Sequence, residues 1–76
     1  MAAARLDPLQ AFGQCVRARR LKNGMSQEQL GFSAGLHPTY ISGVERGVRN
    51  IGLRNLLALA KALEIDPATL VRGLAN

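Results

Sequence analysis

The apolar residues of this chain recur at helical spacing, in five segments separated by short turns that contain glycine or proline. Alternation with period two does not continue beyond a few residues, so we expect an all-α fold. The first helix should begin with Asp7 as N-cap and Pro8 at its first position, where a missing backbone N–H costs nothing. Phe12 and Val16 form its apolar face, and the Asn-Gly pair at 23–24 should end it.

Residues 26–47 read SQEQLGFSAGLHPTYISGVERG and contain two short helical patterns around a glycine turn. Ser26 is a good N-cap, and Gln29 three residues later completes a capping box. Gly35 can adopt the left-handed conformation that ends a helix, and Pro38 fits the first position of the next helix. This spacing predicts a helix-turn-helix formed by the second and third helices.

The second helix of this motif should turn a polar face to solvent. Ile41 and Val44 recur at i, i+3 and mark its buried side. The residues expected to face outward are Thr39, Ser42, Gly43 and Arg46. Gly31, on the preceding helix, should allow the two helices to cross closely because it has no side chain.

Two further helices are expected after a loop at residues 47–52. The inward face of the fourth helix should consist of Leu53, Leu56, Leu57, Ala60 and Leu63. Asp66 should cap a fifth helix that begins at Pro67 and ends near Leu74.

The length of 76 residues predicts a single domain, residues 1–76, with flexible residues 1–6 and no room for a ligand-sensing module. Ten Lys and Arg residues against five Asp and Glu give a net charge of +5, as expected for a protein that binds a polyanion. A solvated basic face would have the same composition, so the charge supports the motif and does not establish a function alone.

Cys15 is the only cysteine and cannot form an internal disulfide, which favours a reducing, cytoplasmic location. The N-terminal segment lacks the apolar core of a signal peptide, and the longest apolar run, residues 56–60, is too short to span a bilayer. The one histidine, His37, and the one cysteine have no triad or metal-site spacing, so we expect no enzyme, metal or cofactor.

The motifs SQEQL, the turn glycine, IS and ERG together resemble the lambda-repressor-like helix-turn-helix regulators, often called the Xre family. The segment TYISGVERGVRN is most similar to the restriction-modification controller proteins within that family. The resemblance implies a compact five-helix fold and a sequence-specific transcriptional regulator that binds double-stranded DNA as a homodimer. It also implies a partly buried ion pair between Arg20 and Glu45.

In a helix-turn-helix the second helix enters the major groove with its N-terminal part foremost. The candidates for base contact are therefore Thr39, Tyr40 and Ser42, although Tyr40 could equally pack over the preceding helix. Gln27, at the positive end of the first helix of the motif, is expected to bind a phosphate. The residues expected near the sugar-phosphate backbone are Arg46, Arg49 and Asn50, and Arg49 could also read a guanine.

One such domain reads only a few base pairs, so useful specificity calls for two copies on a two-fold related site. The C-terminal stretch has more apolar residues than one small core should absorb, and we expect Ile65, Leu70, Val71 and Leu74 to form the dimer interface. The alternative is that these four residues complete the core of the monomer.

The alternative function is protein binding through the same fold, as in an antitoxin or a bridging protein. RNA polymerase is a candidate protein partner of a bridging regulator. A protein partner would require an apolar surface away from the DNA-reading helix.

Overall fold

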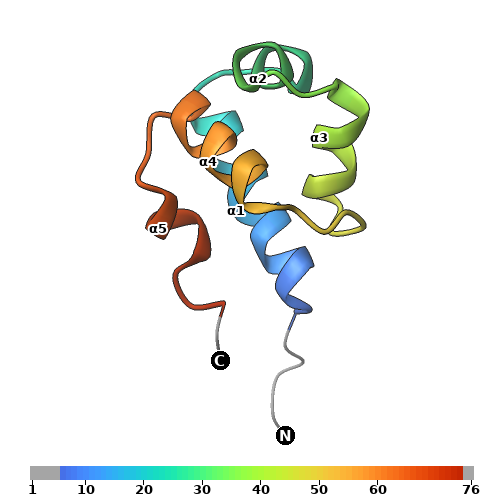
Figure 1. The fold of residues 1–76 in the computed structure, drawn as a ribbon, viewed down its shortest axis with the longest axis vertical. Coiled ribbons are helices and arrows are strands. Elements are labelled where there is room, and N and C mark those ends of the chain that lie inside the picture. Colours follow the sequence, from blue (N-terminus) through green and yellow to red (C-terminus); the bar gives the residue numbers. More distant parts are fainter. Residues whose placement is uncertain (1–5, 75–76) are drawn as a thin grey trace, which may run out of the picture.

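The computed structural model describes residues 6–74, and over these residues the chain forms five α-helices and no strand (Figure 1). The helices are α1 (Pro8–Lys22), α2 (Gln27–Ala34), α3 (Pro38–Glu45), α4 (Leu53–Ala62) and α5 (Pro67–Val71). The predicted all-α fold is confirmed. Flexibility was predicted for residues 1–6. Residues 1–5 lie outside the described residues, and Leu6 is exposed.

Local side chains fix the start of four helices. The carboxylates of Asp7 and Asp66 accept hydrogen bonds from the backbone two residues later, each at 2.9 Å. Ser26 and Gln29 form the reciprocal pair of a capping box at the start of α2. The ring Nδ1 of His37 accepts from the backbone N–H two residues later, at 3.0 Å, and so caps α3. These caps satisfy backbone donors that a helix start leaves unpaired.

α1 runs through the middle of the molecule, with α3 packed on one side of it and α5 on the other (Figure 1). α2 contacts α3 and α4 and closes one end. The buried apolar residues are Phe12, Val16, Leu30, Ile41, Val44, Leu59, Ala60, Leu63 and Leu70. Each helix contributes to this core, so none of them is stable by packing on its own. Within residues 6–74, every helix lacks the length or the apolar content needed to cross a membrane.

Gly13 allows α1 and α3 to meet at backbone distance. A Cβ atom on Gly13 would lie 2.3 Å from the carbonyl oxygen of Val44 and 2.6 Å from that of Glu45. No side chain fits in this space, so the crossing that orients α3 depends on a glycine in α1.

The prediction for the inward face of α4 was wrong at two positions. Leu53 and Leu57 are 69% and 47% exposed, whereas Leu59, which was not predicted to face inward, is fully buried. Leu59 shares a helix face with Leu56 and Leu63, which lie three residues before it and four residues after it. α4 is therefore rotated relative to the predicted orientation, so that some of its leucines pack in the core and others lie on the surface.

α5 is shorter than predicted. It ends at Val71 instead of near Leu74, because Arg72 is extended and Gly73 adopts a left-handed φ of 84°. The chain turns at that glycine, two residues after the helix ends, and Leu74 packs against the core.

Candidate nucleic-acid interface

The turn between α2 and α3 has the geometry that the sequence predicts. Gly35 has φ 72° and ψ 30°, and its conformation ends α2. The backbone N–H of Leu36 donates to the carbonyl of Gly31 at 2.8 Å. A Cβ atom on Gly31 would lie 2.4 Å from the carbonyl oxygen of Leu36 and 3.4 Å from the backbone nitrogen of Pro38, so the close approach that Gly31 allows is to the turn and to the first residue of α3.

α3 turns a polar face outward. Thr39 and Arg46 are exposed, and Ser42 is half-buried between them along the helix. The Nε of Arg46 donates to the hydroxyl of Ser42 at 3.3 Å, so the structure brings together two of the predicted DNA-binding residues. Asn50 is exposed in the loop that follows α3.

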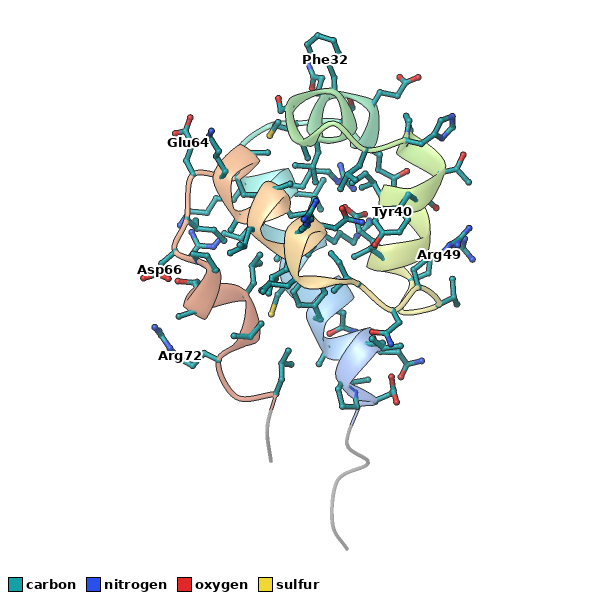
Figure 2. The ribbon with its side chains drawn as sticks, viewed as in Figure 1. Phe32, Tyr40, Arg49, Glu64, Asp66 and Arg72 are labelled. Carbon is teal, nitrogen blue, oxygen red and sulfur yellow. The ribbon has the colours of Figure 1, made fainter. Side chains whose placement is uncertain are left out.

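Tyr40 makes a contact with α4 that the sequence did not suggest, while its predicted base contact stays a prediction. Its ring is half-buried against the core, and its hydroxyl accepts a hydrogen bond from the Nδ2 of Asn55 on α4 at 3.1 Å. The guanidinium carbon of Arg49 lies 5.9 Å from the centroid of the ring, within cation–π range (Figure 2).

The prediction that Gly43 faces solvent was wrong. Gly43 is buried, and a Cβ atom there would lie 2.6 Å from the Cγ of Arg49. The side chain of Arg49 therefore covers this part of α3. Asn55 was not among the predicted site residues, and its only sequence feature is a polar side chain within a leucine-rich helix.

A buried ion pair holds the end of α3 against α1. Arg20 donates from Nε to Oε2 of Glu45 at 2.6 Å and from a terminal nitrogen to Oε1 at 3.0 Å. Its other terminal nitrogen donates to the carbonyl of Met25 at 2.9 Å. Hydrogen bonding to Glu45 raises the pKa of Arg20 above its ordinary value; burial opposes this shift, and the charge of Glu45 adds to it.

Gln27 extends this network to the start of α2. Its side-chain nitrogen donates to Oε1 of Glu45 at 3.0 Å, and the residue is half-buried. The amide of Gln27 is thus held in place by a buried carboxylate, which accepts from one of its two N–H groups and leaves the other without a partner among the described residues. The arrangement connects α1, the first turn of α2 and the last turn of α3 through three side chains.

The residues predicted for the dimer interface do not share one environment. Leu70 is fully buried in the monomer, which contradicts its assignment to an interface. Ile65 and Leu74 are half-buried and pack against the core, while Val71 is 40% exposed. The alternative, completion of the monomer core, therefore holds for Leu70.

Other chemistry is not evident in the part of the chain that the structure describes. In residues 6–74, no three His, Cys, Asp or Glu side chains are grouped so that they could hold a metal ion. Cys15 is half-buried at the surface between α1 and α5.

The close-packed turn, the capped helices and the polar face of α3 define a helix-turn-helix domain. The chain belongs to the helix-turn-helix family, whose family model matches residues 16–70. Among its relatives, the chain is similar to the control protein C.BamHI of Bacillus amyloliquefaciens, with 52% identity over 61 residues, which are 79% of this chain and 75% of the relative.

Two solved structures show the same architecture. The restriction-modification controller protein C.AhdI from Aeromonas hydrophila has a TM-score of 0.81 and 52% identity, over 82% of this chain and 94% of that one. The controller protein C.Esp1396I, solved as a tetramer in complex with its natural 35-base-pair operator, has a TM-score of 0.80 and 33% identity, over 92% of each chain. The resemblance to controller proteins that the sequence indicated is confirmed.

Proposed function

We propose that this protein is a sequence-specific DNA-binding transcriptional regulator of the controller type that acts as a homodimer. The observation that carries the proposal is the exposed polar face on the second helix of a helix-turn-helix, with Arg46 and Arg49 beside it. The net charge of +5 would attract the domain to any duplex before a sequence is read. The proposed role is binding, without a catalytic step.

In the proposed complex the N-terminal half of α3 lies in the major groove, where Thr39 and Ser42 reach base edges. Arg46 and Asn50 lie at the end of α3 and in the next loop, in position to contact phosphates. Gln27 sits at the positive end of α2, and its bond to Glu45 holds its amide ready to donate to a phosphate oxygen. Different residues would thus read the bases and position the protein on the phosphate backbone.

The proposal is tested by selecting bound duplexes from a random-sequence pool and measuring affinity by fluorescence anisotropy at several salt concentrations. We expect one enriched sequence and a slope of log K against log salt of about −0.9 for each phosphate that is neutralised. Thr39→Ala should reduce the preference at one base pair by about 1–3 kcal/mol and leave the salt slope unchanged. Arg46→Ala should weaken binding to all duplexes and reduce the slope by about one unit.

Equal affinity for all sequences, or a flat response to salt, would rule out a sequence-specific regulator. Full discrimination by the Thr39→Ala protein would show that α3 does not read the sequence in the proposed way.

A second candidate function, contact with a protein partner, is favoured by Phe32. This side chain is 91% exposed and points outward from α2, away from α3 (Figure 2). A large apolar side chain so exposed would gain free energy if a partner covered it. We propose RNA polymerase as that partner, because a regulator that holds DNA through α3 would leave this face of α2 free.

Transcription from a template that carries the selected sequence beside a promoter tests this second candidate with purified polymerase. Phe32→Ser should keep the affinity for the selected duplex while its effect on transcript level falls at least about fivefold, as expected if a single buried contact of about 1 kcal/mol is lost. Leu6→Ser is the matched control, because Leu6 is also apolar and 48% exposed, and it precedes α1, which begins at the end of the molecule opposite α2 (Figure 1). If Phe32→Ser and the wild type change transcription equally, Phe32 has no role in a polymerase contact.

A further inference from the structure

The side chain of Arg49 follows an unusual path. Arg49 belongs to the loop after α3, yet its aliphatic stem lies against Gly43, inside the helix, and its guanidinium lies over the ring of Tyr40 (Figure 2). Tyr40 and Gly43 are three residues apart and share one face of α3. The arginine is therefore folded back from the C-terminal end of the helix toward its N-terminal half.

Two features make this path available. Gly43 has no Cβ, and with one the side chain of Arg49 would have to move, because the Cβ would lie 2.6 Å from its Cγ. Tyr40 offers the face of an aromatic ring, which attracts a guanidinium. That ring is itself fixed from a second helix, because Asn55 of α4 donates to its hydroxyl at 3.1 Å.

We propose that Gly43, Tyr40 and Asn55 form an arginine clamp that presets Arg49 to read a guanine in the major groove. This inference rests on the DNA-binding function proposed above. It makes Gly43 and Asn55 positioning residues, which contact Arg49 or Tyr40 and need not contact DNA.

The chemistry of the clamp fits a base-reading arginine. Stacking on Tyr40 occupies one face of the guanidinium and leaves its N–H edges free, and within residues 6–74 Arg49 makes no hydrogen bond or ion pair. Two parallel N–H groups match the O6 and N7 acceptors of guanine. The N-terminal half of the reading helix, toward which the guanidinium is carried, is the part of a helix-turn-helix that reaches base edges.

Holding the arginine in place beforehand also favours binding. A free arginine loses much of its rotamer freedom when it docks, and a preset one loses less. A clamp of this kind should strengthen binding by about three- to tenfold.

The test uses the whole protein and a duplex selected by the wild type from a random-sequence pool, together with its single-base variants. Gly43→Ala should lower the affinity for the selected duplex about three- to tenfold and reduce discrimination at the same base pair as Arg49→Ala does. Asn55→Ala should also lower the affinity for the selected duplex. Tyr40→Phe keeps the ring and removes the bond from Asn55, so it should lower this affinity less than Gly43→Ala does. In an Arg49→Ala background none of these changes should lower the affinity further.

Folding is checked by circular dichroism. Gly43 has an ordinary helical backbone, so alanine there should preserve α3. Gly52→Ala is the glycine control, because nothing lies within 4 Å of a Cβ at that position. Arg72→Ala is the charge control, because Arg72 follows α5 on the far side of the molecule (Figure 2).

The outcomes separate the clamp from the function on which it rests. If the wild type selects no sequence, the proposed function fails. If it does select one, the clamp is overturned by losses that persist in the Arg49→Ala background, or by folded Gly43→Ala and Asn55→Ala proteins that discriminate as the wild type does.

Discussion

Glu45→Ala is expected to destabilise the fold by about 3–5 kcal/mol, enough to unfold the domain if its stability is low. The substitution leaves the guanidinium of Arg20 buried, at 6% exposure, without the carboxylate that receives two of its hydrogen bonds. Breaking a buried pair by removing one partner costs about 3–5 kcal/mol. A domain of 76 residues has a free energy of unfolding of about 4–11 kcal/mol, so the loss is at least about a quarter of the stability and all of it at the lower end of this range.

Arg20 cannot avoid this cost by losing its proton, because the guanidinium of an arginine stays protonated at neutral pH even when it is buried. Gln27 also loses its hydrogen-bond acceptor, which loosens the start of α2. Thermal and urea unfolding, followed by circular dichroism, should show a melting temperature at least about 12 °C lower.

Glu28→Ala is the matched control, because Glu28 is an exposed acid in the first turn of α2 and should change stability by no more than about 1 kcal/mol. An unchanged melting temperature for Glu45→Ala would mean that the ion pair contributes nothing to stability.

Val71→Glu is expected to convert the proposed dimer into monomers and to lower operator affinity about 100-fold or more, because one domain then binds a single half-site. Val71 is the one predicted interface residue that is exposed. α5 packs against α4, where Leu53 and Leu57 are also exposed, and we propose that the surface contacted by a second copy includes both helices. A carboxylate placed in such an interface would have to be buried without a partner.

Sedimentation equilibrium measures the oligomeric state directly. Leu57→Glu should have the same effect, and Gln14→Glu, which adds the same charge on the exposed surface of α1, should leave the dimer intact. Leu74→Glu is a poor test, because Leu74 packs against the core and its substitution would also affect folding. A wild type that stays monomeric at high micromolar concentration would contradict the interface.

The features that the sequence predicts correctly depend on near neighbours along the chain. Asp7, Ser26 and Asp66 each cap the helix that follows them, and Gly35 ends α2 through its own backbone. Such interactions span two to four residues, so the residue types alone determine them. The helix-turn-helix is a string of these local features, which explains why the order of residue types is enough to identify it.

The incorrect predictions concern contacts between helices. α4 contains so many leucines that several helix faces look apolar, and the packing of α4 against α2 and α5 decides that Leu59 faces inward and Leu53 outward. Asn55 meets Tyr40 across fifteen residues, and Gln27 meets Glu45 across eighteen. No spacing rule connects such pairs, and a polar residue in either helix would ordinarily be taken as solvated.

Two neighbouring residues of α5 have different roles. Leu70 is buried in the core and stabilises the fold, whereas Val71 is exposed and faces the proposed partner. Association through this helix would therefore also hold the core closed, and the dimer would be more resistant to local opening than the monomer. Proteases that cleave the transiently open form act on its equilibrium population. The half-life of each molecule in the cell would then lengthen as its own concentration rises, so that scarce copies are removed quickly and abundant ones persist.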